Sequence, residues 1–159
     1  MATRSVALDP DPATDLYEAD FYAWTVRQAA LLRSGDLGQA DRTNLAEEIE
    51  TLGRSERAAL RSAYRLVALH LLKLNAQKER ASRSWLGTIA RERAHAARVL
   101  ADNPTLKPQR EDLFRQAYQD ARKEAAAETG LPLATLPVEP AFTLAALEDE
   151  HFLPNAPTR

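Results

Sequence analysis

The sequence predicts an all-α fold: a single-domain helical bundle of four main helices, with a long central second helix and a short C-terminal helix. Leu, Ala, Arg and Glu dominate a chain of 159 residues that has only five Gly, a composition that favours helix. Inward-facing positions at helical spacing run without a change of phase from Leu45 to Lys73. Residues 61–74 are apolar nearly all round, so other helices should surround them.

The first helix should begin between residues 14 and 20 and end near Ser34, where the run Ser34-Gly35-Asp36 breaks the pattern. Its inward face should carry residues at alternating spacings of four and three, namely Tyr17, Phe21, Trp24, Gln28 and Leu31. Residues 1–13 contain two prolines and little to bury, so we expect a flexible N-terminal arm.

The second helix should begin near Asp41, which is a good N-cap residue, and continue to about Asn75. Its inward stripe comprises Leu45, Ile49, Leu52, Glu56, Ala59, Ala63, Leu66, His70 and Lys73. Because this stripe keeps its phase across Gly53, one continuous helix is favoured over two. A glycine within a helix costs only about 1 kcal/mol relative to alanine.

A polar turn over residues 76–83 should lead into a third helix from about Ser84 to Asp102. Its inward stripe comprises Leu86, Ile89, Arg93, Ala96 and Leu100, with Glu92 at the edge. Asn103-Pro104 should end it, since Asn tolerates a left-handed cap and Pro cannot continue a helix.

The fourth helix should begin at Pro108 and end at Gly130 as its C-cap glycine. It should bury Leu113, Phe114, Ala117, Ala121 and Ala125. Three prolines make residues 131–141 an extended strap, and a short helix should begin at Thr143, stapled by Phe142 and Leu147. The domain should therefore span residues 14–153, with a tail at 154–159.

Composition also bears on function. The absence of cysteine excludes disulfides, thiolate metal sites and cysteine nucleophiles. No N-terminal apolar run has signal-peptide length, and no segment approaches the roughly 20 apolar residues of a membrane span. We therefore expect a soluble cytoplasmic protein with no membrane association.

Several segments resemble a known bacterial family. Residues 44–57 read Asn-Leu-Ala-Glu-Glu-Ile-Glu-Thr-Leu-Gly-Arg-Ser-Glu-Arg. Shorter segments are Asp-Phe-Tyr-Ala-Trp at 20–24, His-Leu-Leu-Lys at 70–73, Arg-Ser-Trp at 83–85 and Thr-Gly-Leu-Pro at 129–132. In this order, from about residue 17 to 154, they resemble bacterial domain-of-unknown-function family 29. The resemblance implies a small cytoplasmic all-α domain. It implies no activity and no catalytic or binding residue.

A candidate polar cluster consists of residues on or beside the inward stripes: His70, Lys73, Glu92, Arg93, Glu48 and Glu56. His70 is either a core histidine with one hydrogen-bond partner or a general base. Glu92 is its nearest expected carboxylate if the third helix packs antiparallel. Glu56 and Arg93 need partners or access to water, either in structural ion pairs or around a small anion. Any pocket should lie where His70 and Lys73 meet residues 89–93.

No metal or cofactor is expected. Glu92 and His95, like Glu148 and His151, have the Glu-x-x-His spacing of di-iron bundles. However, His95 lies about 120° from Ile89 on a helical wheel and should face outward. His151 follows the short last helix. Glu48 and its neighbouring carboxylates form either a solvated face or an acid–base or divalent-cation site. Phosphate-binding loops, dinucleotide motifs and protease motifs are absent.

Charge is distributed unevenly along the chain. Residues 73–98 carry seven basic and two acidic groups, whereas residues 111–151 carry nine acidic and three basic. These segments either neutralise each other or leave a basic patch for an anionic partner. The candidates for such a patch are Lys78, Arg80, Arg83, Arg91 and Arg98.

The function itself is not specified by the sequence. The leading interpretation is a non-enzymatic helical interaction or regulatory module, acting through a protein partner or by self-association. The alternative is a nucleic-acid-associated protein that uses the basic 73–98 patch, although the whole chain is slightly acidic, with a pI near 5.9. A small hydrolase or nuclease that uses His70 is a third candidate.

Overall fold

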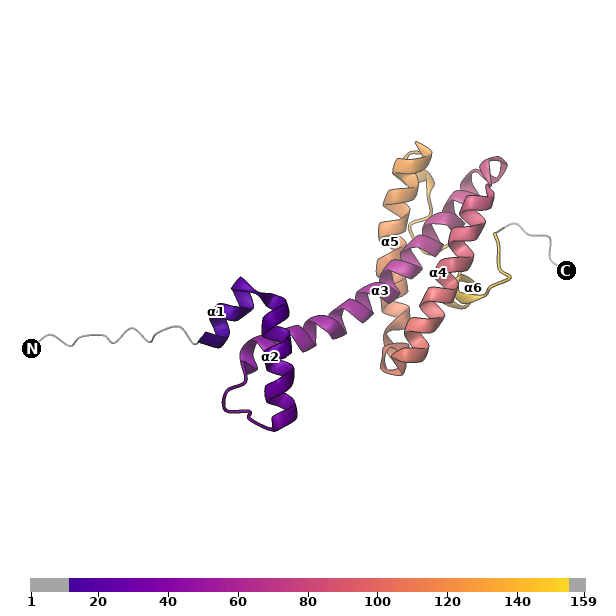
Figure 1. Ribbon diagram of the computed structural model, residues 1–159. Helices are drawn as coiled ribbons and strands as arrows, with labels where there is room; N and C mark the ends of the chain where they lie inside the picture. Colours follow the sequence, from indigo (N-terminus) through magenta and orange to yellow (C-terminus); the bar gives the residue numbers. More distant parts are fainter. Residues whose placement is uncertain (1–11, 155–159) are drawn as a thin grey trace, which may run out of the picture. The chain divides into compact units, whose positions relative to one another are not determined.

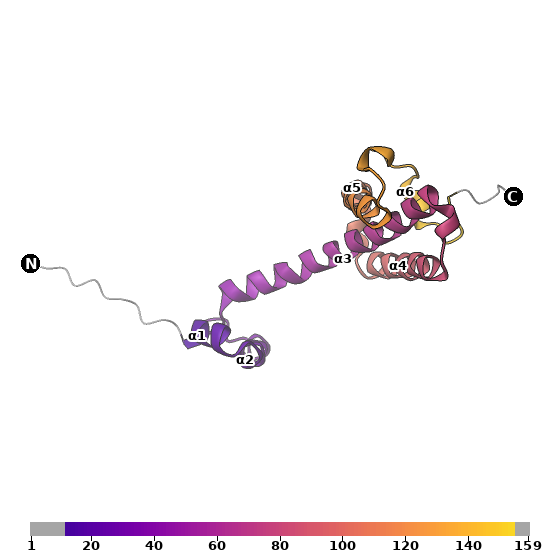
Figure 2. The ribbon, with the colours of Figure 1, turned by 90° about the horizontal axis from the view of Figure 1, so that it is seen from above.

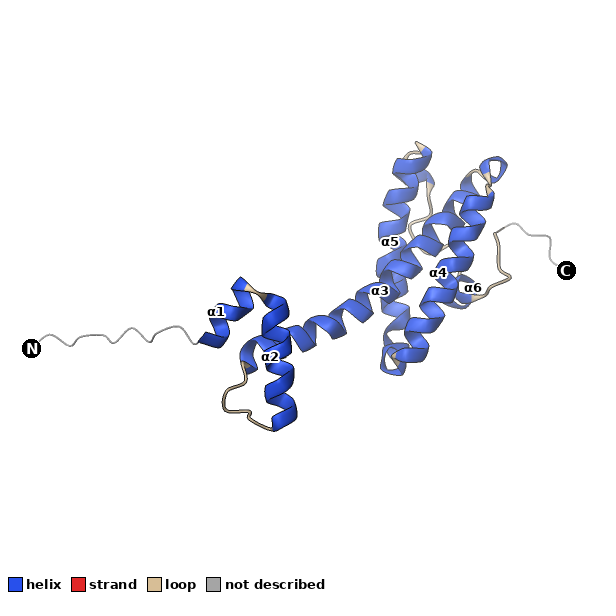
Figure 3. Cartoon of the chain, viewed as in Figure 1, coloured by secondary structure: helices blue, strands red, loops and turns tan. Residues whose placement is uncertain are grey.

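The computed structural model describes residues 12–154, with side chains from residue 16 onward. Residues 1–11 of the expected arm and 155–159 of the expected tail lie outside this range. Within it every regular element is helical and no strand occurs (Figure 3). The α-helices are α1 (Pro12–Ala19), α2 (Phe21–Ser34), α3 (Arg42–Ala76), α4 (Arg83–Asp102), α5 (Arg110–Thr129) and α6 (Leu144–Glu148). The all-α class and the long central helix are confirmed.

Three short 3₁₀ helices join these elements: η1 (Lys78–Arg80), η2 (Pro104–Gln109) and η3 (Leu133–Thr135). Because η2 takes up the residues after Asn103, α5 begins at Arg110 and not at Pro108. Asn103 ends α4 with φ −128°, so the left-handed cap expected there is wrong. Gly35 and Gly130 do adopt left-handed caps, with φ 79° and 72°. None of the described helices is long and apolar enough to cross a membrane.

The stretch expected to form one first helix is divided into α1 and α2 at Asp20. This residue has φ −152°, outside the helical region, and its side chain accepts a hydrogen bond from the Ala23 amide. Short acidic side chains favour this N-cap role because they satisfy a free amide of the first turn. Phe21, expected to face inward, is 48% exposed and stacks on Trp24.

Helix α3 starts where the sequence places it, and Asp41 Oδ1 accepts a hydrogen bond from the Asn44 amide at 3.2 Å. The helix continues through Gly53, where an added Cβ would meet nothing within 4 Å. The inward stripe is wrong in its first part, because Ile49 and Leu52 are 64% and 68% exposed. From Leu60 onward the helix is buried on several sides, as its apolar composition predicts.

The chain divides into two compact units, Met1–Gly53 and Arg54–Arg159, and the boundary falls inside α3. We call their described parts the N-terminal unit (residues 12–53) and the C-terminal unit (residues 54–154). The boundaries 14–153 for a single domain remain a prediction.

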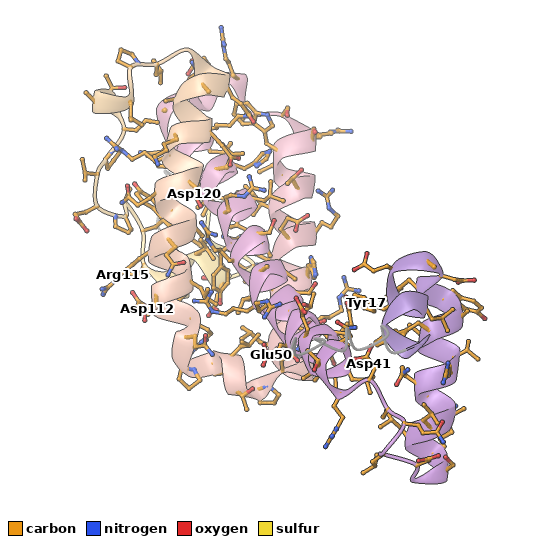
Figure 4. All side chains as sticks on the ribbon, turned by 90° about the vertical axis from the view of Figure 1, so that its left-hand side faces the viewer. Tyr17, Asp41, Glu50, Asp112, Arg115 and Asp120 are labelled. Carbon is orange, nitrogen blue, oxygen red and sulfur yellow. The ribbon has the colours of Figure 1, made fainter. Side chains whose placement is uncertain are left out.

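In the C-terminal unit, α4 and α5 flank the second half of α3 in both views (Figures 1 and 2). Arg61 pairs with Asp120, which is labelled on α5 in Figure 4, and Arg65 pairs with Glu124. In each pair the two residues are 59 positions apart in the sequence. Because a step of four residues along α3 is matched by a step of four residues along α5, the two helices run in the same direction. All five apolar residues expected inside α5 are buried, whereas Leu86 of α4 is 40% exposed and was wrongly placed inside.

The strap after α5 is fastened by hydrogen bonds to its backbone. Tyr118 donates its hydroxyl to the Pro137 carbonyl at 3.0 Å, and Arg122 donates to the Leu136 carbonyl at 3.0 Å. The strap leads to α6, whose N-cap Thr143 accepts from the Ala146 amide. Phe142 and Leu147 are both buried, as expected for the two members of a staple.

In the N-terminal unit, a polar network around Asp41 links α2 to the start of α3. Trp24 donates its indole N–H to Asp41 Oδ2 at 3.2 Å, and the Asp41 amide donates to Gln28 Oε1 at 2.9 Å. Tyr17 and Asp41 are labelled in Figure 4. Among the described side chains of this unit, only Trp24 and Gln28 are buried.

Candidate functional site

His70 and Lys73 both contact Trp85 at the C-terminal end of α3. The His70 ring meets the Trp85 ring edge-on, with centroids 6.4 Å apart. Lys73 Nζ lies 4.3 Å from the Trp85 ring centroid and donates to Glu128 at 2.6 Å. His70 Nδ1 is 2.9 Å from the Leu66 carbonyl oxygen within its own helix. These contacts are those of a packed structural region.

Glu92 is buried in α4 but does not pair with His70. Its carboxylate accepts from Arg91 Nε at 3.0 Å, and its other oxygen lies 3.7 Å from His95 Nδ1. The pair of His70 and Glu92 expected from the antiparallel packing is therefore not formed among the described residues. Trp85 takes the place beside His70 instead.

Arg93 is buried and binds main-chain carbonyls of the segment that follows the strap. Nε donates to Leu147 at 2.7 Å, Nη1 to Glu150 at 3.4 Å, and Nη2 to Ala146 at 3.3 Å and Phe152 at 3.0 Å. Burial lowers the pKa of Arg93, and Asp149 opposes that shift. A cation at the C-terminal end of α6 also complements the helix dipole. Arg93 therefore fastens α6 to α4.

The other two predicted residues lie elsewhere. Glu48 accepts from the Tyr17 hydroxyl at 2.6 Å, and this hydrogen bond is the main cause that raises the pKa of Tyr17 to about 12. Glu56 is exposed and accepts from Asn103 Nδ2 at 3.0 Å. His70 and Lys73 thus share Trp85, whereas Glu92, Arg93, Glu48 and Glu56 each have other partners, and a functional role for any of the six remains a prediction.

The basic candidates Lys78, Arg80, Arg83, Arg91 and Arg98 are all exposed. On α4, Arg83, Arg91 and Arg98 fall within about 80° at 100° per residue. Arg91 is engaged by Glu92. Mutual neutralisation of the basic segment 73–98 and the acidic segment 111–151 also has support, since Lys73 pairs with Glu128.

A cavity of about 320 Å³ lies in the C-terminal unit. It is lined by Tyr64 and Val67 of α3, by one face of α4, by Lys107 of η2, and by Leu147 and Glu148 of α6. The α4 face contributes Arg93, Ala96, Ala97, Leu100 and Ala101. This is not the predicted location, since neither His70 nor Lys73 lines the cavity.

The polar end of this cavity is a linked triplet. Tyr64, fully buried, donates its hydroxyl to one oxygen of Glu148, and Arg110 Nη1 donates to the other at 3.0 Å. Burial, followed by the hydrogen bond to Glu148, raises the pKa of Tyr64, so the phenol stays protonated as a donor. From the sequence, Glu148 was considered only with His151 and its pairing with Tyr64 was missed, because the two residues are 84 positions apart and share no local motif.

An exposed apolar face lies on α2. Tyr22 is 79% exposed and Val26 54% exposed, while Ala29 is half-buried and Arg33 exposed. These four residues follow a 4-3-4 spacing and fall within about 60° at 100° per residue. The buried residues Trp24 and Gln28 lie on the opposite side of the helix. Helix α2 therefore carries exposed apolar side chains on the side opposite its buried residues.

Among residues 12–154, no group of three or more His, Asp or Glu side chains is placed to hold a metal ion. A family model described as "Domain of unknown function DUF29" matches residues 16–153. No curated protein and no solved structure shows a significant similarity to the chain.

Proposed function

The chain belongs to the DUF29 family, whose description assigns no activity, and we propose from its own surfaces that it is a non-enzymatic interaction module that self-associates through α2. The observation that carries this proposal is the exposed face of Tyr22, Val26, Ala29 and Arg33. Of the ten large apolar side chains that are exposed in the described chain, seven lie in residues 21–52. Exposed apolar residues gathered in one region mark interaction surfaces.

A second copy of this chain is the occupant that fits the face best. In an antiparallel pair with two-fold symmetry, Tyr22 of each copy meets Arg33 of the other, and Val26 meets Ala29. Arginine over a tyrosine ring is a favourable cation–π arrangement. The positively charged C-terminal end of each α2 also approaches the end that carries Asp20.

The expected dimer is of moderate strength. Helix α2 has 14 residues and is therefore about 21 Å long. One helix pair of this length buries less than the roughly 1,200 Å² at which stable interfaces begin. We expect dissociation in the micromolar range, which makes the equilibrium accessible to sedimentation velocity.

Sedimentation velocity across a concentration series tests the proposal. The wild type should shift from monomer to dimer, and Val26→Glu should remain monomeric because it places a charge in the apolar contact. Leu86→Glu is the matched control: it puts the same charge on an exposed leucine of α4 and should leave the dimer intact. A wild type that stays monomeric throughout would exclude self-association.

A charge exchange tests the antiparallel geometry. Arg33→Glu alone should weaken the dimer. The double variant Tyr22→Arg with Arg33→Glu should restore it, because the introduced arginine of each copy then pairs with the introduced glutamate of the other. The two positions are about 16 Å apart within one helix, so they cannot pair within a copy. A double variant weaker than Arg33→Glu would rule out this arrangement.

Nucleic-acid association is the second candidate, and it is supported by the exposure of Arg83, Arg91 and Arg98 on one side of α4. Binding through phosphate contacts weakens steeply with salt, whereas an apolar helix pair persists. A gel shift that appears at low salt and is lost in the triple Arg→Gln variant would favour this alternative. A dimer that persists at high salt would support self-association through α2.

A further inference from the structure

We propose that the cavity of the C-terminal unit binds a small monocarboxylate with an apolar tail, with the tail between α3 and α4 and the carboxylate on Lys107. This inference is independent of the α2 contact. The cavity volume of about 320 Å³ falls at the lower end of the roughly 300–1,000 Å³ of small-molecule sites.

The cavity exists because α4 presents short side chains there. Ala96, Ala97 and Ala101 line the cavity together with Leu100, and each of the three side chains is a single methyl group. The opposite walls are fixed. Arg93 holds α6 through four carbonyl hydrogen bonds, and Glu148 is held by Tyr64 and Arg110. Because these bonds fix the distances between α3, α4 and α6, the helices do not close the cavity.

The tail is assigned to the apolar walls. Val67, Ala96, Leu100 and Leu147 are buried, so this part of the cavity is shielded from water. Ala97, Ala101 and Lys107 are exposed, so the cavity opens to solvent on their side. A ligand can therefore enter beside Lys107 and bury its apolar end. Each buried CH₂ group contributes about 0.8 kcal/mol.

The charge of the ligand follows from the charges of the lining. Glu148 is neutralised by Arg110, and the Arg93 guanidinium is occupied by carbonyls yet keeps its positive charge. Lys107 Nζ has no ion-pair partner in the described part of the chain. The lining itself therefore carries two cations, Arg93 and Lys107, against one carboxylate, Glu148, while Asp149 lies near Arg93. This balance favours an anion and disfavours an ammonium group.

Octanoate is the probe, with 1-octanol and octylamine as neutral and cationic counterparts of equal tail length. Titrations of the full chain, followed by heteronuclear NMR, should show saturable one-to-one binding in the order octanoate, octanol, octylamine. The largest changes in amide chemical shift should occur in residues 64–67 and 96–101. Lys107→Met should weaken octanoate about tenfold, the value of one charge-assisted hydrogen bond, and leave octanol unchanged.

Cavity filling locates the site. Ala97→Leu, and separately Ala101→Leu, should weaken octanoate and octanol alike by at least about tenfold, because the added side chain occupies the volume of the tail. Ala94→Leu is the matched control, since Ala94 is exposed on α4 and does not line the cavity. Val26→Glu should bind octanoate normally. Non-saturable binding, or equal affinity in Ala97→Leu and wild type, would overturn the proposal.

Discussion

The two units of this chain stabilise themselves by different means. In the C-terminal unit a continuous apolar core, whose members lie between Leu60 and Leu147, involves α3, α4, α5 and α6. In the N-terminal unit only Trp24 and Gln28 are buried among the described side chains, and a hydrogen-bonded network around Asp41 holds them. Burial of apolar surface is the dominant favourable contribution to folding. The C-terminal unit therefore covers most of its large apolar side chains within one chain, whereas the N-terminal unit leaves seven of its own exposed, and the proposed self-association would cover part of them.

The largest effect should come from the closed core. Phe114 is 2% exposed and contacts Tyr118 and Phe142. Phe114→Ala should lower the free energy of unfolding of the C-terminal unit by about 3–5 kcal/mol, the usual cost of a large core truncation. Trp85 fluorescence in a Trp24→Phe background follows this unit during denaturant unfolding. An unfolding midpoint close to that of the background would show that the core does not carry the stability of this unit.

The next effect concerns the attachment of α6. Arg93→Met removes all four carbonyl hydrogen bonds, and each net contribution is about 0.5–1.5 kcal/mol. We expect amide exchange in residues 147–153 to accelerate at least about tenfold, while exchange in α5 changes little. Arg91→Met is the control, because Arg91 is exposed and, among the described residues, its ion pair is with the neighbouring Glu92. Equal acceleration in both variants would contradict the role assigned to Arg93.

A smaller effect should be confined to the N-terminal unit. Asp41→Ala removes the N-cap of α3 and the acceptor of the Trp24 indole. Loss of an N-cap costs about 0.5–2 kcal/mol. Trp24 fluorescence in a Trp85→Phe background should report earlier unfolding of this unit. Asp102→Ala removes an exposed carboxylate from the C-terminal unit and should leave the unfolding midpoint reported by Trp24 unchanged. If Asp102→Ala lowered this midpoint as much as Asp41→Ala does, the distinction between the units would be removed.

The smallest effect should be a loss of stability of the N-terminal unit at alkaline pH. The hydrogen bond to Glu48 raises the pKa of Tyr17 from 10 to about 12, so the neutral phenol is the form favoured by folding. Its contribution is therefore complete below pH 10 and is lost as the pH rises toward 12. Tyr17→Phe should abolish this part of the alkaline change in Trp24 fluorescence. An identical pH profile in the variant would assign the change to other groups.

Most helix positions were predictable from the sequence because they depend on local signals, although the break at Asp20 and the start of α5 at Arg110 were not. The continuity of α3 through Gly53, the N-cap Asp41 and the buried face of α5 were all confirmed. Exposure at Ile49, Leu52 and Leu86 was not predictable, since periodicity shows which residues share a face and not whether another helix covers it. The cavity was missed for a similar reason. Tyr64, Glu148 and Arg110 meet only through tertiary packing, and the three alanines of α4 resemble ordinary helix formers.

Hydrogen exchange at two protein concentrations tests the central contrast most directly. If a second copy covers α2, amides of residues 21–34 should become more protected as the concentration rises from about 1 to 100 μM, across the expected dissociation range. Amides of α4 and α5 should show the same protection at both concentrations, because their core is complete in one chain. Val26→Glu should remove the concentration dependence. Protection of α2 that is independent of concentration in the wild type would contradict the account.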